Sequence, residues 1–278
     1  MRDSTSLPDL RLLPISLLVP HEETDPRRVE KLAGRILEEG RLKNPPIVAP
    51  IPETDRFVIL DGANRAMAFN RLGIPHIVVQ VVSYDDPGVV LDTWYHVIAG
   101  MSLDEFEERI RQVTDMQLEA CTLKEAREAL ASNEAAAYIV CESGVRKVCN
   151  ANSSCMRDIH LLNRIVAAYK GCADIYRASN DIWEIQKPYY PNITALIIFP
   201  QFSTTDILEI ARDSHWVPTG VTRHIVSPRA VNINIPIGVL WAGWPMEQKE
   251  QWLRDWLMER MGANAIRYYA ESTFTFDE

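Results

Sequence analysis

Short apolar runs and amphipathic stretches alternate along the first hundred residues. Four apolar runs are typical of buried strands: 10–20, 45–51, 56–60 and 76–82. Two stretches with apolar residues at every third or fourth position predict helices: 21–40 and 62–73. The order strand, helix, strand, strand, helix, strand predicts a small mixed α/β unit with a partly covered sheet.

The first predicted helix has well-defined ends. Asp25 is a suitable N-cap, Pro26 suits the first helical position, and Gly40 is a typical helix stop. The spacing places five apolar residues on one stripe: Val29, Leu32, Ala33, Ile36 and Leu37. We expect this stripe to be buried, and we expect Gly73 to close the second helix in the same way.

The pattern changes after residue 100. Residues 102–113 and 123–132 are charged amphipathic stretches that predict two connecting helices. Alternation then resumes, and further elements are predicted at 135–140, 155–171, 172–179, 194–200, 204–214, 221–226, 230–240, 245–261 and 266–276. Among these, 155–171, 204–214 and 245–261 are the helices, and the last should bury Trp252, Leu253, Trp256 and Leu257.

Composition narrows the class of protein. The chain has 278 residues, of which 47% are hydrophobic and 24% charged, as in ordinary globular proteins. A net charge of −9 argues against a chain built to bind DNA phosphates. No apolar run reaches the ~18 residues of a membrane span, and the start lacks a secretory pattern, so we expect a cytoplasmic protein. Five irregularly spaced cysteines favour reduced thiols over disulfides or zinc.

The stretch VILDGANRAMAF joins a predicted strand directly to a predicted helix. Its turn consists of Asp61, Gly62, Ala63, Asn64 and Arg65. Unpaired N–H groups at a helix N-terminus favour an anion, glycine permits close approach, and the arginine can bind a phosphate with two hydrogen bonds. Asp61 suits such a site if a cation such as Mg²⁺ lies between it and the phosphate. Alternatively, Asp61 only caps the helix and Arg65 is solvated.

Three other polar clusters carry candidate chemistry. Glu22 lies between a strand and a helix, as a general base or as an exposed turn residue. In the strand-like stretch 91–98, Trp94 and His96 should face away from Thr93, and such a histidine is also typical of a core. A third cluster follows a Pro-Thr-Gly turn: Thr222 and Arg223, where the arginine suits a carboxylate clamp or an edge charge.

Taken together, these segments resemble one family. HE at 21–22, DGANR at 61–65, TWYH at 93–96 and GVTR at 220–223 follow the order found in the free serine kinases of the ParB/sulfiredoxin-like superfamily. YKGC at 169–172 and the run 231–240 are also similar, most of all to the branch encoded with staphyloferrin B biosynthesis. The resemblance covers about residues 10 to 270.

The resemblance implies an activity and a set of roles. Such kinases phosphorylate free L-serine to O-phosphoserine with ATP or ADP and Mg²⁺, which would supply amino-acid or siderophore precursors. Glu22 then matches the base for the serine hydroxyl, and Asp61 matches a second essential acid that we expect to hold the metal. The turn Gly62, Ala63, Asn64 and Arg65 matches the nucleotide phosphate loop. The segments around the amino acid correspond to Thr93, Trp94, His96, Thr222 and Arg223.

The fold implied is α/β (mixed α+β) in three parts. Residues 1–105 are predicted to form a ParB/sulfiredoxin-like nucleotide-binding domain, 106–134 a helical connector, and 135–278 a C-terminal α/β domain that completes the substrate site. The expected partners are nucleotide and free serine, without membrane or nucleic acid. One position departs from the family motif Asp-Gly-x-His-Arg, because Asn64 replaces the histidine and cannot carry charge or shuttle a proton.

Three rival functions remain open at this point. A ParB-like regulator would bind nucleotide or DNA without kinase activity. A sulfiredoxin-type reductase needs a cysteine in the phosphate loop, where this chain has Ala63 and Asn64. A kinase of another small hydroxyl compound, such as threonine or a natural-product precursor, fits the same residues as a serine kinase.

Overall fold

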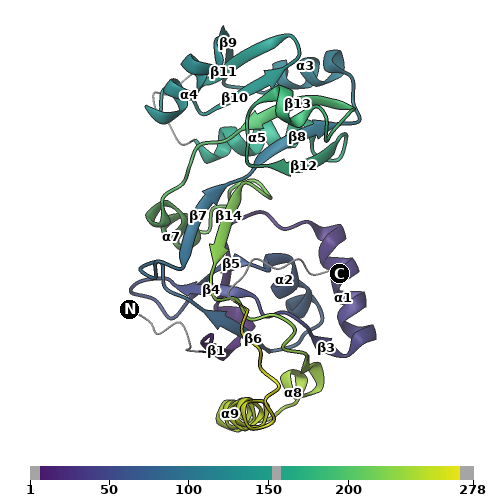
Figure 1. The fold of residues 1–278 in the computed structure, drawn as a ribbon, viewed down its shortest axis with the longest axis vertical. Helices are drawn as coiled ribbons and strands as arrows, with labels where there is room; N and C mark the ends of the chain where they lie inside the picture. Colours follow the sequence, from purple (N-terminus) through teal and green to yellow (C-terminus); the bar gives the residue numbers. More distant parts are fainter. Residues whose placement is uncertain (1–6, 152–157, 270–278) are drawn as a thin grey trace.

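The protein has two lobes, each built on its own β-sheet, with a two-stranded ribbon between them (Figure 1). The computed structural model describes residues 7–151 and 158–269. No helix in these ranges is both long and apolar enough to cross a membrane. The fold is mixed α/β, as predicted.

The first lobe contains a five-stranded sheet. Its strands, in spatial order, are β1 (Leu10–Pro14), β6 (His76–Val81), β4 (Ile47–Pro50), β5 (Phe57–Asp61) and β2 (Leu18–Pro20). β2 runs parallel to β5, with Pro20 opposite Ile59. Because parallel strands end at the same edge of a sheet, the residues that follow β2 and β5 lie close together.

Helices α1 (Pro26–Glu39) and α2 (Ala63–Arg71) pack against each other, and their buried residues share an apolar cluster with this sheet. Asp25 caps α1 by accepting a hydrogen bond from the Arg27 amide at 2.9 Å, and Gly40 ends it in the left-handed conformation, so both predicted ends are confirmed. Val29, Ala33 and Ile36 of the predicted stripe are buried. Leu37 is 49% exposed, because it lies at the border of the stripe and beyond the core.

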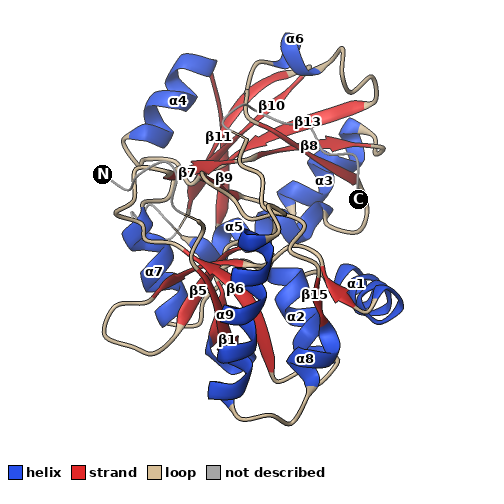
Figure 2. Ribbon diagram, turned by 60° about the horizontal axis from the view of Figure 1, so that its bottom comes forward, coloured by secondary structure: helices blue, strands red, loops and turns tan. Residues whose placement is uncertain are grey.

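The second lobe contains a six-stranded, wholly antiparallel sheet. Its strands, in spatial order, are β12 (Asp174–Ala178), β8 (Tyr95–Ala99), β13 (Ile193–Ile198), β10 (Ala137–Cys141), β11 (Gly144–Asn150) and β9 (Met116–Cys121). The accompanying helices are α3 (Leu103–Arg111), α4 (Leu123–Ala131), α5 (Ile159–Tyr169), α6 (Trp183–Gln186) and α7 (Thr204–Arg212). Figure 2 shows α3, α4, α5 and α6 around the sheet.

The ribbon between the lobes pairs β7 (Val89–Thr93) with β14 (Thr222–Val226) in antiparallel register. A single apolar cluster runs through both lobes and includes Val58 and Leu60 of the first sheet, Ile98 and Ile197 of the second, and Val221 beside the ribbon. The two lobes therefore hold the ribbon, and the residues at its ends, in a fixed position.

The end of the chain returns to the first lobe. β15 (Ile235–Pro236) pairs with β3 (Arg41–Leu42), and α8 (Ile237–Trp241) and α9 (Met246–Gly262) follow. Leu253 of α9 is buried in the same apolar cluster as Leu12 of β1, and both views place α9 beside β1 (Figures 1 and 2). Of the predicted inner face only Leu253 is buried, whereas Trp252, Trp256 and Leu257 are partly buried against the same cluster.

Several predicted elements differ from the structure. The run 10–20 is split into β1 and β2 by a short 3₁₀ helix (Ile15–Leu17), which turns the chain between two positions in the sheet. The predicted connector 106–134 also contains β9, an edge strand of the second sheet. A further strand, β11, was not predicted, because its polar residues lack clear alternation.

Two further corrections concern the C-terminal part. The run 230–240 forms only the two-residue β15 before it becomes α8. Residues 266–269 are irregular and exposed, so this part of the predicted closing strand is wrong. The remainder of that strand, 270–276, and the first three residues of the helix predicted at 155–171 lie outside the described residues.

Candidate active site

The candidate site lies where β2 and β5 end, next to the start of β14. Glu22 follows β2 and Asp61 ends β5, so the parallel pairing brings the two predicted acids to one edge of the sheet. Both line a cavity of about 680 Å³. The sequence predicted both acids, but not that a single cavity joins them.

Glu22 is held by the loop that leads into β14. Its Oε2 accepts a hydrogen bond from the Gly220 amide at 2.9 Å, and its Oε1 accepts from the Thr222 amide at 2.8 Å and the Thr222 hydroxyl at 2.6 Å. All these donors are uncharged. The carboxylate is thereby fixed in orientation without being neutralised, which is the state that a general base requires.

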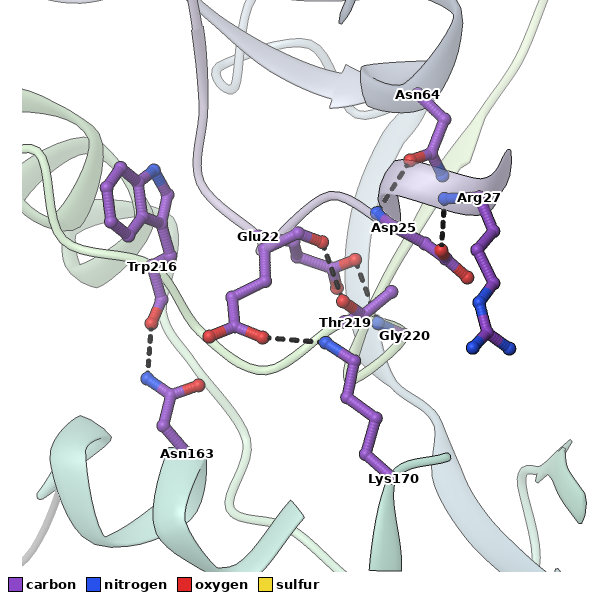
Figure 3. A network of polar contacts seen from close by, with 10 residues as sticks. Glu22, Asp25, Arg27, Asn64, Asn163, Lys170, Trp216, Thr219 and Gly220 are labelled. Atoms are coloured by element: carbon purple, nitrogen blue, oxygen red, sulfur yellow. Dashed lines mark hydrogen bonds and ion pairs between the residues drawn. The ribbon is translucent and has the colours of Figure 1, made fainter. Parts of the chain in front are cut away.

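A neighbouring pair of contacts ties the same loop to both lobes. Thr219 donates its hydroxyl to the Glu23 carbonyl at 2.6 Å, and Lys170 at the end of α5 binds the Glu23 carboxylate at 2.9 Å. Asn163 of α5 donates to the Trp216 carbonyl at 2.8 Å. Figure 3 shows this network around Glu22. The second lobe thus positions the loop that holds Glu22.

His21 lies behind Glu22 and is 3% exposed. Its Nδ1 is 2.8 Å from the Ile59 carbonyl, and its Nε2 is 2.8 Å from the Thr222 hydroxyl. Burial lowers the pKa of His21, whereas the Glu22 charge and the Ile59 carbonyl act in the opposite direction. The sequence contained the His-Glu pair but gave no role to this histidine.

The turn Asp61 to Arg65 has the backbone of a phosphate loop. Gly62 has φ of 86° and is the N-cap of α2. A Cβ at this position would lie 2.8 Å from the Arg65 guanidinium and 3.1 Å from the Pro46 backbone, so glycine is required here. The first amides of α2 have no partner within the helix, and they are therefore available to an anion.

Asn64 joins the two helices at the site. Its side-chain oxygen accepts a hydrogen bond from the Asp25 amide at 3.0 Å (Figure 3). Because that amide belongs to the N-cap of α1, the contact sets the start of α1 against the start of α2. The asparagine that replaces the family histidine therefore has a structural contact here.

Asp61 has a charged partner that the sequence did not indicate. Arg229, which follows β14, forms an ion pair with the Asp61 carboxylate, and both side chains are 41% exposed. Within residues 7–151 and 158–269, no three side chains of His, Cys, Asp or Glu gather as metal ligands. A single carboxylate is still sufficient for Mg²⁺ when substrate phosphates supply further oxygens, so Asp61 fits that ion.

The cavity is cationic, although the chain as a whole is acidic. Its acidic lining residues are Glu22, Glu23, Glu39 and Asp61. The cationic ones are twice as many: Arg28, Arg35, Arg41, Lys43, Arg65, Arg177, Arg223 and Arg229. A cavity lined in this way attracts an anionic ligand, and several of its cations lie along α1 and β3 beyond the phosphate loop.

The side chains predicted around the amino acid divide into two groups. Trp94 and Arg223 line the cavity, and the Arg223 guanidinium stacks on the Trp94 ring at 4.1 Å while it binds the Asp92 carboxylate at 3.4 Å. Thr222 also lines it, beside Glu22.

Thr93 and His96 are buried, with 3% and 1% of their surface exposed, and are not part of the cavity lining. His96 packs against Phe199 and shares a hydrogen bond with the Tyr169 hydroxyl at 2.8 Å. Burial, assisted by the Arg177 charge, lowers the pKa of His96 to about 4. The predicted alternation along 91–98 fails because β7 ends at Thr93 and β8, in another sheet, begins at Tyr95.

Arg177 of β12 is a site residue that the sequence did not reveal. Its guanidinium lies over Gly220, where a Cβ would come within 2.7 Å of Nη2. Gly220 in turn donates to Glu22, so Arg177 and Glu22 both contact this glycine, and both line the cavity. The nearby YKGC segment pointed to this region but not to this residue.

Comparison with known proteins agrees with this geometry. Residues 2–100 match the ParB N-terminal domain. A solved structure described as a free serine kinase in complex with AMP superposes with a TM-score of 0.72 at 19% identity, over 85% of this chain and 95% of the other. The protein has the fold of a free serine kinase.

Two curated relatives extend the likeness to the sequence. An ATP-dependent L-serine kinase of Staphylothermus marinus is 27% identical over 239 residues, which cover 82% of this chain and 90% of the relative. The ATP-dependent L-serine kinase SbnI of Staphylococcus aureus is 23% identical over 272 residues, 97% of each chain. The resemblance seen in the motifs is therefore confirmed over nearly the whole chain.

Proposed function

We propose that the protein is a small-molecule kinase that transfers a phosphoryl group from ATP or ADP to the hydroxyl of free L-serine, giving O-phosphoserine. The observation that carries the proposal is the meeting of Glu22 and the phosphate loop at one sheet edge, in one cationic cavity. The relatives of similar length, named ATP-dependent L-serine kinases, support the same enzyme class.

The nucleotide is held from the first lobe. Its phosphates lie at the N-terminus of α2, where backbone amides and the helix dipole favour negative charge and Arg65 neutralises it. The remaining cations along α1 and β3, including Arg28 and Arg41, extend the binding surface for the rest of the nucleotide. Phosphoryl transfer depends mainly on such positioning and charge neutralisation.

Mg²⁺ is part of the proposal. Asp61 would hold the ion together with the nucleotide phosphates, in place of its ion pair with Arg229. When bound, the ion would neutralise phosphate charge. Asp61 is well placed for this role, since it is the last residue of β5 and directly precedes the phosphate loop.

Serine is bound between the lobes. Glu22 takes the proton of the serine hydroxyl as the serine oxygen bonds to the terminal phosphorus, and the bond from that phosphorus to the bridging oxygen breaks, so that the shortened nucleotide leaves. Arg177 and Arg223 flank the carboxylate of the amino acid. Arg223 already has Asp92 and Trp94 as partners, whereas Arg177 lies over Gly220, whose amide donates to Glu22. On this basis the first lobe holds the nucleotide, and Arg177 and Thr222 from the predicted domain 135–278 complete the substrate site. The predicted boundaries at 105 and 134 do not coincide with the lobes, because β8 and β9 both belong to the second sheet. We place the reaction in the cytoplasm.

The test is phosphorus NMR of the protein with Mg²⁺, ATP or ADP, and a panel of free amino acids and small alcohols. A new phosphomonoester signal with serine, absent in the Glu22→Ala variant, is the expected result. A signal only with threonine or another alcohol would support a kinase, but would show that its substrate is that alcohol and not serine. Nucleotide binding without any phosphomonoester, together with a gel shift of unrelated DNA duplexes, would instead favour a ParB-like regulator.

A further inference from the structure

Three short hydrogen bonds connect the core of the first lobe to the Glu22 carboxylate. They join the Ile59 carbonyl to His21 Nδ1 at 2.8 Å, His21 Nε2 to the Thr222 hydroxyl at 2.8 Å, and the same hydroxyl to Glu22 Oε1 at 2.6 Å. Each of the three contacts needs one proton between its heavy atoms.

The four groups joined by these hydrogen bonds do not together carry three protons in their simplest protonation states. A carbonyl only accepts, so His21 must carry a proton on Nδ1. A neutral His21 then has a bare Nε2, the Thr222 hydroxyl brings one proton, and an ionised Glu22 brings none. Two protons cannot fill three contacts. When all three hydrogen bonds are formed, this series of groups therefore holds one further proton, on His21 or on Glu22.

We propose that His21, acting through the Thr222 hydroxyl, holds the proton that would otherwise neutralise Glu22 and so keeps this carboxylate available as a base. The catalytic role of this proton rests on the proposed kinase function. The presence of the proton follows from the three hydrogen bonds and does not depend on that function. His21 is a positioning residue here, because it reaches the substrate only through Thr222 and Glu22.

The exchange between the two forms is balanced. The bond between Glu22 Oε1 and its proton breaks as that proton bonds to Thr222 Oγ1, while the original Thr222 hydroxyl proton moves to His21 Nε2. Net charge is unchanged and no other reactant is needed. In the resulting form both His21 N–H groups donate, Thr222 donates to Oε1, and Glu22 Oε2, which binds only the Gly220 amide among described donors, is left to meet the serine hydroxyl.

Burial lowers the pKa of His21 overall, so a charge on this ring depends on the groups that face it. Glu22 faces it from its own segment. From β14, His224 lies edge-on at a ring distance of 5.3 Å, and burial lowers the pKa of His224 to about 3, so this ring stays neutral. Behind it, Tyr84 bonds His224 at 2.8 Å, and burial raises the pKa of Tyr84. The one charged group facing His21 among these is thus the carboxylate.

Four variants test the proposal through the pH profile of kcat/KM for serine. Thr222→Val breaks the chain, and His21→Asn keeps an amide donor for Ile59 but cannot hold the extra proton. Each should shift the acidic limb to higher pH by about one unit. The double variant should shift it no further, and Thr222→Ser should restore the wild-type profile. Additive shifts in the double variant, or an unshifted limb in both single variants, would overturn the proposal.

A second readout does not depend on activity. Nitrogen NMR of the imidazole rings should show His21 with both ring nitrogens protonated in the wild type at low pH. In Thr222→Val and in Glu22→Gln, that protonated state should appear only at lower pH, because the carboxylate no longer stabilises it. A His21 signal that titrates identically in all three proteins excludes the shared proton. If the wild type makes no phosphoserine, the kinase proposal fails, and the NMR result still decides this one.

Discussion

The two carboxylates of the site lie at one sheet edge but are held in opposite ways. Glu22 is fixed by three hydrogen bonds from neutral groups of the loop that enters β14. Asp61 instead forms an ion pair with the partly exposed Arg229. The first arrangement orients a charge without cancelling it, whereas the second can be exchanged, because an exposed ion pair contributes only about 1 kcal/mol or less.

This difference supports the two proposed roles. A general base must be fixed near the attacking hydroxyl, and the hydrogen bonds to Glu22 hold it in one orientation. A metal ligand must be able to give up its resting partner, and the exposed ion pair of Asp61 suits that role. On this proposal the same residue type serves two functions, and the partners decide which function each residue has.

The largest expected effect concerns the Glu22 side of the comparison. Glu22→Ala should lower kcat by roughly 10²–10⁴-fold, since general base catalysis contributes about that factor, and should leave nucleotide affinity nearly unchanged. Steady-state kinetics and a nucleotide titration measure the two quantities. Glu23→Ala is the matched control, because it removes the adjacent acid and its contact with Lys170 but not the base. Normal turnover in Glu22→Ala would remove Glu22 from the mechanism.

Acid should weaken the Glu22 side of the comparison, because the buried His96 lies beside the Gly220 backbone, whose amide holds this carboxylate. Burial lowers the pKa of His96 to about 4 from the ordinary 6.5. Stability from this neutral ring is complete above pH 6.5 and is lost as pH falls from 6.5 to 4, by about 3 kcal/mol. Urea unfolding at pH 7 and pH 4.5 measures the loss, and His96→Gln should show a flatter pH dependence. Equal slopes for both proteins would contradict it.

The two arginines proposed to bind the serine carboxylate, Arg177 and Arg223, should differ in their effect on the KM for serine. Arg177→Ala should raise the KM for serine by roughly 10–100-fold, the value of a charge-assisted hydrogen bond of about 1.5–3 kcal/mol. We expect a smaller rise for Arg223→Ala, because Asp92 and Trp94 already occupy that guanidinium. The KM for nucleotide should change little in either variant.

Ethanolamine provides the control for both arginine variants. It lacks the carboxylate, so it should be a poor substrate of the wild type and should be affected little by Arg177→Ala. If ethanolamine matches serine in the wild type, neither arginine acts as a carboxylate clamp. A larger rise in the KM for serine in Arg223→Ala than in Arg177→Ala would show that Arg223, the residue predicted from the sequence, is the main carboxylate clamp.

The smallest effect is expected on the Asp61 side. Asp61→Asn should raise the Mg²⁺ concentration needed for half-maximal rate by at least about 10-fold, since the ion loses one charged ligand. Arg229→Gln, which frees the carboxylate, should not raise it. Rates measured over a Mg²⁺ series give both values. A Mg²⁺ requirement that is unchanged in Asp61→Asn would separate Asp61 from the metal.

Features that depend on neighbouring residues were predictable from the sequence. The ends of α1 follow from Asp25, Pro26 and Gly40, whose conformational preferences act within one helical turn. The strand-to-helix turn of the proposed phosphate loop was predicted from Gly62, because glycine adopts a positive φ without steric cost. Glu22 and Asp61 could likewise be predicted from their own short segments, without knowing which distant residues contact them.

Features that depend on distant residues were decided only by the tertiary structure. Thr222 is 200 residues from Glu22, and Arg229 is 168 residues from Asp61, so no local pattern relates them. The break at Trp94, which buries His96 away from the cavity, arises because β7 and β8 belong to different sheets. Sequence therefore fixes which groups are present and how the chain turns near them, whereas long-range packing fixes their hydrogen-bond partners and thus their chemistry.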